Sequence, residues 1–284
     1  MNKKEKIALV IEGGGFKSVF SAGVLDAFLI NKFNPFDIYI GVSSGAMCLS
    51  YYVANQYKTY FSLSKEVSVN EKFLSYRHAL SEQGYMDLNF LSKYAKEHNP
   101  IDLQNIKEST ENKELYIVAT NLENGEAVYL EPNKKNYYKC LQATSSLPFF
   151  TKGSCKINGV NFMDGAWSDS IPAKSAADFG ATKIIVIRPN PLGYKLNGLS
   201  YLGLAAGYWW KNNPKVRDIF FKEDNKYNEA VDFLTKKHKN IEILQICPDN
   251  LLKSGVVGTS KEDLTQDYHS GLEKGMDFLN TYFL

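Results

Sequence analysis

The 284-residue sequence has few cysteines, few histidines, no excess of either charge and no long hydrophobic run. Its four cysteines are scattered without C-x-x-C spacing, which disfavours a zinc site and is typical of reduced thiols in a cytosolic protein. The 33 basic and 31 acidic residues nearly cancel, so no field of one sign exists to hold a nucleic-acid backbone. We therefore expect no metal, no cofactor and no nucleic-acid partner.

No segment is apolar for long enough to cross a membrane or to form the core of a signal peptide. Near the N-terminus, lysines are followed by only five apolar residues before Glu12. We therefore expect a cytoplasmic protein. The hydrophobic content, 44% of residues, is ample for the buried core of one large α/β domain or two modest ones.

Short β-branched runs alternate with longer helical patterns, which predicts a parallel or mixed sheet covered by helices on both faces. We expect strands at 6–13, 37–43, 115–122, 126–132, 183–189 and 241–248. We expect helices at 17–31, 44–56, 87–98, 171–179 and 263–281.

The stretch from 191 to 240 offers turn residues and helical patterns but no clear strand. We therefore expect a single domain, with a core at 6–189, a helical insertion or lid at about 191–240, and a final strand and helix at 241–284. The alternative is that the residues from about 191 onward form a separate cap.

Two glycine stretches each lie between an expected strand and an expected helix, and the first reads EGGGFKS. Such a loop can present several backbone N–H groups to a ligand at close range. A phosphate-binding Walker loop is excluded, because Ile11 and Phe16 stand where both of its glycines should be. A dinucleotide-binding G-x-G-x-x-G motif matches at Gly13 and Gly15 but has Ser18 at the third glycine, so it is only a partial match.

The second stretch, GVSSG, contains the G-x-S-x-G pattern at Gly41, Ser43 and Gly45. Between a strand and a helix this pattern is typical of a nucleophile elbow, whose small neighbours permit a sharp turn at the serine. The alternative is that Ser43 or Ser44 only caps the helix that follows. Two glycine turns after the first two strands favour a ligand site at that edge of the sheet.

A nucleophilic serine needs a base, which is usually a histidine. The four histidines are His78, His98, His238 and His269. They lie in polar or helical sequence and are expected on the surface, although His269 stays open as a base. A carboxylate is the other option, and the sequence NFMDGAW offers Asp164 before Gly165, where a sharp turn could aim its side chain at a neighbouring loop. Asp169 is the rival acid.

Four segments together carry a family resemblance: EGGGFKSVFSAGVL, GVSSGA, ATSSLPFF and INGVNFMDGAWSDSIP. With their order and spacing, which extend over roughly 6–189, the chain resembles the patatin-like phospholipases, intracellular lipid acyl hydrolases of the bacterial type. The resemblance implies a three-layer α/β/α fold with a central, mostly parallel sheet.

The resemblance also implies a catalytic dyad without histidine, in which Ser43 attacks an ester and Asp164 accepts its proton. Backbone amides would form the oxyanion hole: Gly13, Gly14, Gly15 and Phe16. Lys17 would support the loop where the family usually has arginine, and Ser18 replaces the final glycine of the family loop. Ala166 replaces the second glycine that usually follows the aspartate.

The resulting hypothesis is a serine hydrolase that cleaves carboxyl esters of lipids. Two alternatives stay open, namely an acyltransferase that uses the same dyad and a catalytically weak lipid-binding or regulatory protein. The apolar stretch at 198–211, with aromatic residues and bordering lysines, could contact a membrane peripherally, form a lid, or pack as an ordinary helix. A lipid or acyl ester is the expected partner.

Overall fold

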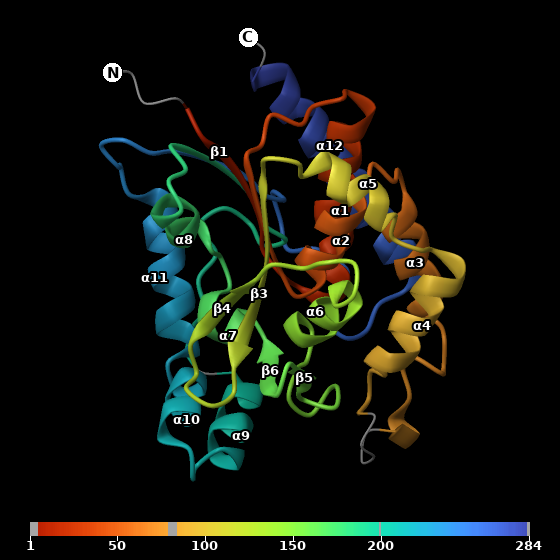
Figure 1. Ribbon diagram of the computed structural model, residues 1–284, viewed down its shortest axis with the longest axis vertical. Helices are drawn as coiled ribbons and strands as arrows, with labels where there is room; N and C mark the ends of the chain where they lie inside the picture. Colours follow the sequence, from red (N-terminus) through yellow and green to blue (C-terminus); the bar gives the residue numbers. More distant parts are fainter. Residues whose placement is uncertain (1–4, 79–83, 199, 283–284) are drawn as a thin grey trace.

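The computed structural model describes residues 5–78, 84–198 and 200–282, in which a mixed sheet lies between two layers of helices (Figure 1). The strands are β1 (Ile7–Ile11), β2 (Ile38–Val42), β3 (Glu114–Asn121), β4 (Ala127–Leu130), β5 (Cys155–Ile157), β6 (Val160–Asp164), β7 (Lys183–Ile187) and β8 (Glu242–Ile246).

Helices connect these strands over both faces of the sheet. They are α1 (Ser18–Ile30), α2 (Ser44–Val53), α3 (Thr59–Val67), α4 (Leu88–His98), α5 (Leu103–Ser109), α6 (Tyr137–Thr144), α7 (Ala166–Asp169), α8 (Ala173–Asp178), α9 (Tyr201–Trp209), α10 (Pro214–Phe221), α11 (Glu223–Thr235) and α12 (Lys261–Tyr282), with short 3-10 turns at Gly15–Lys17 and Tyr76–His78. Within the described residues no helix is long and apolar enough to cross a membrane.

The strand order is β5-β6-β3-β2-β1-β7-β8, and β4 also pairs with β3. The neighbours from β3 to β8 pair in parallel, whereas the pairs of β3 with β4, β3 with β6, and β5 with β6 are antiparallel. Because parallel strands end at the same edge, the segments that follow β1, β2 and β7 meet at one edge of the sheet.

Alternation along β1 shows how the sequence builds two cores. Leu9 and Ile11 face the side covered by α1, α2 and α12, whereas Ala8 and Val10 face the side covered by α8 and α11. All four side chains are fully buried, as expected for a central strand covered on both faces. The continuous apolar run IALVI is the consequence.

The predicted α/β class, with its mostly parallel sheet and a helical segment before the last strand, is confirmed. Each expected strand and helix is present with ends within about two residues of the expected ones, except helix 44–56, which ends at Val53. Helices α3, α5, α6 and α7 were not expected from the sequence. The β5–β6 hairpin was missed, although its turn has the strong hairpin signal Asn158-Gly159, with φ of 49° and 90°. The limits of the predicted domain and its insertion stay predictions.

Candidate active site

Ser43 lies in a sharp turn between the end of β2 and the start of α2. Its φ of 53° is in the left-handed region, which is strained for a residue with a side chain. The flanking glycines permit the turn, because a Cβ at Gly41 would lie 2.5 Å from Cα of Ala46, and one at Gly45 would lie 2.6 Å from the carbonyl oxygen of Glu12. This geometry matches a nucleophile elbow.

Asp164 is the last residue of β6, which pairs with β3, and β3 in turn pairs with β2. This strand order brings two residues that are 121 positions apart into contact, so that Ser43 Oγ donates a hydrogen bond to Asp164 Oδ2 at 2.7 Å. The other carboxylate oxygen, Oδ1, accepts a hydrogen bond from the backbone N–H of Ala166 at 2.9 Å. The carboxylate is thereby fixed from two directions.

Burial dominates the electrostatics of this pair, because only 1% of Asp164 is exposed. Loss of hydration raises the pKa of its carboxyl to about 7, while the hydrogen bonds from Ser43 and Ala166 act in the opposite direction. A carboxyl with a pKa near neutrality can both accept and return a proton under physiological conditions.

Two threonines hold the pair in place, and sequence reasoning missed both. The backbone N–H of Ser43 donates to Thr144 Oγ1 at 2.7 Å, and that hydroxyl donates to the carbonyl oxygen of Val118. Thr120 Oγ1 donates to the carbonyl oxygen of Asp164 at 2.8 Å. Val118 and Thr120 lie on β3, the strand between those that lead to Ser43 and Asp164, so this strand sets the separation of the two residues.

Serines tie the glycine loop to the elbow. The backbone N–H of Gly14 donates to Ser44 Oγ at 3.1 Å, and the hydroxyls of Ser44 and Ser18 share a hydrogen bond of 2.7 Å. Ser18 stands where the family pattern has glycine, and its hydroxyl is what reaches the elbow. The departure from the family motif therefore adds a contact between the two glycine turns.

The amides expected to form an oxyanion hole differ in their hydrogen bonds. The N–H of Phe16 donates to the carbonyl oxygen of Val256 at 3.3 Å, so in this conformation the amide is already paired. Among the described residues, the amides of Gly13 and Gly15 donate to no protein acceptor. Gly13 lies directly beside Ser43, since a Cβ on it would lie 2.8 Å from the Cβ of the serine.

The family model of the patatin-like phospholipases matches residues 9–177, which are more than half of the chain. This chain belongs to the patatin-like phospholipase family. Membership suggests a hydrolase of lipid esters. A second model, described as a domain of unknown function (DUF6363), matches residues 213–283, which span α10, α11, β8 and α12.

Two individual proteins are similar to this chain, and neither comparison assigns it a specific activity. The "Uncharacterized protein YjjU" of Escherichia coli (strain K12) is 28% identical over 277 residues, which are 97% of this chain and 78% of that protein. The crystal structure of VipD from Legionella pneumophila has a TM-score of 0.53 at 12% identity and covers 98% of this chain and 67% of that one. At that identity the likeness shows the fold alone.

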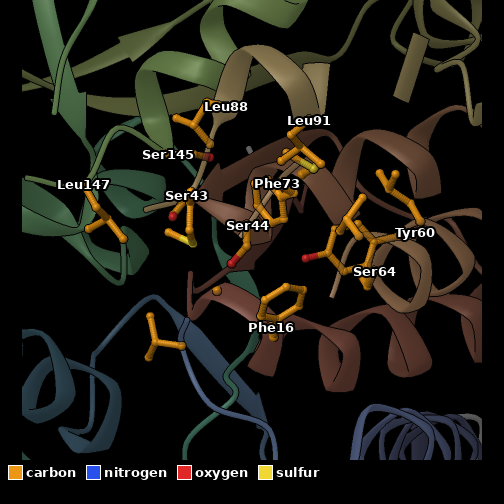
Figure 2. A pocket seen from close by; sticks show the side chains of 16 residues that line it. Phe16, Ser43, Ser44, Tyr60, Ser64, Phe73, Leu88, Leu91, Ser145 and Leu147 are labelled. Carbon is orange, nitrogen blue, oxygen red and sulfur yellow. The ribbon is translucent and has the colours of Figure 1, made fainter. Parts of the chain in front are cut away.

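A cavity of about 70 Å³ opens beside Ser43 in this patatin-like fold, and most of its lining surface is apolar. Its walls come from the glycine loop, the elbow, α2, α3, α4 and the segments between α3 and α4, after α6 and before α12. The lining residues are Gly15, Phe16, Ser43, Ser44, Met47, Tyr60, Leu63, Ser64, Val67, Phe73, Met86, Leu88, Leu91, Ser145, Leu147 and Val256. Figure 2 shows Ser43 on one side of the cavity and Tyr60 on the other, with Phe16 and Phe73 between them.

The rival residues are occupied elsewhere. Asp169 accepts hydrogen bonds from Tyr129 Oη at 2.5 Å and from Ser175 Oγ at 2.8 Å. The histidines with described side chains, which are His98, His238 and His269, do not line the cavity. The side chain of His78 lies outside the described part of the structure. Within the described residues no group of three His, Cys, Asp or Glu side chains could hold a metal ion.

A buried ion pair anchors the start of the glycine loop, and it too was missed from sequence. Arg188 Nε donates to Glu12 Oε2 at 2.9 Å, and both side chains are buried. Tyr227 Oη donates to Glu12 Oε1 at 2.9 Å and accepts from Arg188 Nη2 at 3.0 Å. Asn190 Nδ2 also donates to Glu12 Oε1, and its Oδ1 accepts from Lys17 Nζ at 3.4 Å. Lys17 thus joins the same network.

Arg188→Met is expected to lower the free energy of unfolding by about 3–5 kcal/mol, because it leaves the charge of Glu12 buried without its partner. We also expect kcat to fall, since Glu12 immediately precedes the glycine loop. Urea unfolding followed by circular dichroism measures the first effect. Lys174→Met breaks an exposed ion pair with Asp178 and is the matched control, for which we expect little change. Equal stability losses in the two variants would contradict this role.

Proposed function

We propose that this protein is a serine acyl hydrolase that cleaves carboxyl esters of lipids through Ser43 and Asp164. The single observation that carries the proposal is the 2.7 Å hydrogen bond from Ser43 Oγ to Asp164 Oδ2 at the wall of an apolar cavity. A strained serine, a buried carboxylate beside it and an apolar binding space are what acyl transfer from a lipid requires.

In the first half of the reaction, Ser43 Oγ attacks the ester carbonyl carbon while its proton passes to Asp164 Oδ2. Collapse of the tetrahedral intermediate breaks the bond to the alcohol, which leaves with the proton held by Asp164. Water then attacks the acyl-enzyme, giving one proton to Asp164 and releasing the fatty acid. That proton returns to Ser43 Oγ, which restores the enzyme.

We assign the oxyanion hole to the amides of Gly13 and Gly15. Both are without a protein acceptor among the described residues, and Gly15 lines the same cavity as Ser43. Gly15 has a φ of 60°, and a Cβ there would lie 1.9 Å from the carbonyl oxygen of Val256, so only glycine fits. A lost oxyanion donor typically costs about 3 kcal/mol of transition-state stabilisation, so this loop contributes directly to the rate.

Hydrolysis of p-nitrophenyl esters over a series of acyl lengths tests the proposed function. Purified wild-type protein should turn over these esters, and the longer-chain esters should be preferred because the lining surface of the cavity is mostly apolar. An organophosphonate should label one serine, and peptide mass spectrometry should locate it at Ser43. If the protein neither turns over these esters nor is labelled, the result would favour the catalytically weak lipid-binding alternative.

Leu91→Trp is expected to shorten the preferred acyl chain. Leu91 lies on α4 and lines both the main cavity and a smaller one, of about 10 Å³, that shares Met47 and Leu88 with it. A larger side chain there should lower the ratio of kcat/KM for decanoate to that for butyrate by about tenfold. Leu103→Trp, on α5 outside both cavities, is the matched control, and an equal ratio in the two variants would place the acyl chain elsewhere.

A further inference from the structure

Four large apolar side chains of helix α9 are exposed to solvent. Tyr201 is 94% exposed and Trp209 is 71% exposed, and Leu204 and Tyr208 between them are also exposed. The spacing of 201, 204, 208 and 209 places these residues on one face of a helix. The outward face is therefore the apolar one, which is the reverse of an ordinary surface helix.

Small residues lie on the inward face of α9, and their packing fixes the orientation of the helix. Ala206 is fully buried, and a Cβ at Gly207 would lie 2.6 Å from the ring of Phe221. At the start of the helix, Ser200 Oγ accepts from the N–H of Gly203 at 2.9 Å and donates to Glu223 Oε2 at 2.6 Å. Because Gly203 and Gly207 lie in close contact with Glu223 and Phe221, α9 cannot rotate to bury its apolar face.

Positive charge borders this apolar face. Between 200 and 224 the chain carries four basic and three acidic residues. Asp218 pairs with Arg217, and Glu223 accepts a hydrogen bond from Ser200 Oγ. Three exposed lysines remain: Lys211, Lys215 and Lys222. Lys211 Nζ lies 4.9 Å from the ring centroid of Tyr208, so charge and aromatic surface are adjacent. This combination complements a negatively charged surface with an apolar interior.

The apolar face continues toward the cavity beside Ser43. The ring of Trp209 meets that of Phe149 edge-on, with their centroids 6.0 Å apart. Phe149 lies two residues beyond Leu147, which lines the cavity and also packs against the apolar cluster that contains Ala206. Figure 1 shows α9 and α10 at the same end of the molecule as β6, the strand that carries Asp164.

We propose that α9 and its bordering lysines dock this protein on the surface of an anionic phospholipid bilayer. Tyr201, Tyr208 and Trp209 enter the interface, where amphipathic aromatic rings are most favourable, and the lysines contact lipid phosphates. Docking through this face brings the wall of the acyl cavity to the membrane. The inference rests on the proposed function for its purpose, because a lipid hydrolase needs access to bilayer lipids.

Co-sedimentation with vesicles tests the docking surface, using full-length protein that carries Ser43→Ala so that no lipid is consumed. Vesicles of phosphatidylcholine with phosphatidylglycerol are compared with vesicles of pure phosphatidylcholine. The protein should bind the anionic vesicles more tightly. Tyr208→Ser with Trp209→Ser, and separately Lys211→Gln with Lys215→Gln, should each weaken this binding by about tenfold or more.

Matched controls carry the same changes elsewhere on the surface. Leu192→Ser with Leu251→Ser removes two other exposed apolar side chains, and Lys237→Gln with Lys239→Gln removes two other exposed charges. Both controls should bind like the parent protein, and thermal melting should show that every variant is folded. Equal binding by test and control variants, or no binding by the parent, would overturn the proposal.

A second copy of the chain is the competing occupant of this face. A dimer that becomes a monomer in the Tyr208→Ser, Trp209→Ser variant, without vesicle binding by the parent, would assign the surface to self-association and overturn docking. Because binding is measured with Ser43→Ala protein, the result does not depend on turnover. Failure of ester hydrolysis in the wild type would contradict the proposed function and leave the vesicle result intact.

Discussion

Ser43→Ala is expected to abolish ester hydrolysis, with kcat/KM falling by about 10⁴-fold or more, because no other hydroxyl bonds to Asp164 Oδ2 among the described residues. The fold should persist, since among the described residues the hydroxyl bonds only to that carboxylate, and the turn is held by the hydrogen bond from the backbone N–H of Ser43 to Thr144. Initial rates on a p-nitrophenyl ester, with melting curves of both proteins, measure the effect.

Ser64→Ala is the matched control for that experiment. Ser64 lines the same cavity and is buried, but Asp164 accepts its serine hydrogen bond from Ser43 instead. We expect the control to keep turnover within a few-fold of the wild type. Substantial activity in clean Ser43→Ala protein would show that the nucleophile lies elsewhere.

Asp164→Asn is the second large effect, with an expected loss of about 10³-fold in kcat, because an amide cannot take the proton of Ser43. In the wild type the base must be ionised, and burial raises the pKa of the Asp164 carboxyl to about 7. The value of kcat/KM should therefore fall as pH drops through about 7 and level off above it. The residual activity of Asp164→Asn should lack this dependence.

Stability should move in the opposite direction to activity. The folded protein holds the proton of Asp164 more tightly than the unfolded chain, where the pKa is ~3.9. The free energy of unfolding of the wild type should therefore decrease as pH rises from about 4 to about 7, and Asp164→Asn should remove that decrease. Urea unfolding at several pH values measures it. If Asp164→Asn is more stable than the wild type at pH 8 but has lost turnover, misfolding of the variant cannot explain the loss.

Two further variants separate Asp164 from its rivals. Asp169→Asn should retain most activity, because the hydroxyls of Tyr129 and Ser175 hold this carboxylate away from Ser43. His269→Ala should be nearly silent, since the side chain is exposed on α12. A loss in His269→Ala as large as that in Asp164→Asn would support a histidine as the base.

Most of the fold followed from local sequence. The alternation of β-branched runs with helical patterns identified six of the strands, because a buried parallel strand needs a continuous apolar run such as that of β1. The β5–β6 hairpin was missed, since its strands are short and the exposed Lys156 and Asn161 interrupt their apolar pattern. The Asn158-Gly159 turn was the usable signal.

The sequence by itself determined the residue types at the candidate site, since a nucleophile elbow and a glycine loop are local motifs whose turns depend on neighbouring residues. Their assembly depended on tertiary structure. The contact of Ser43 with Asp164 arises from the order of β2, β3 and β6, and the anchoring of Glu12 by Arg188 joins strands 176 positions apart.

Tertiary structure also decided which groups are occupied and which face solvent. The carbonyl of Val256 takes the amide of Phe16, although the two are far apart in sequence. In α9, the sequence shows an apolar stretch but not which side of it faces the protein. The side that packs inward carries Gly203 and Gly207, which lie against Glu223 and Phe221. Long-range packing alone turned Tyr201, Tyr208 and Trp209 outward, since a hydrophobic pattern specifies a face and not its partner.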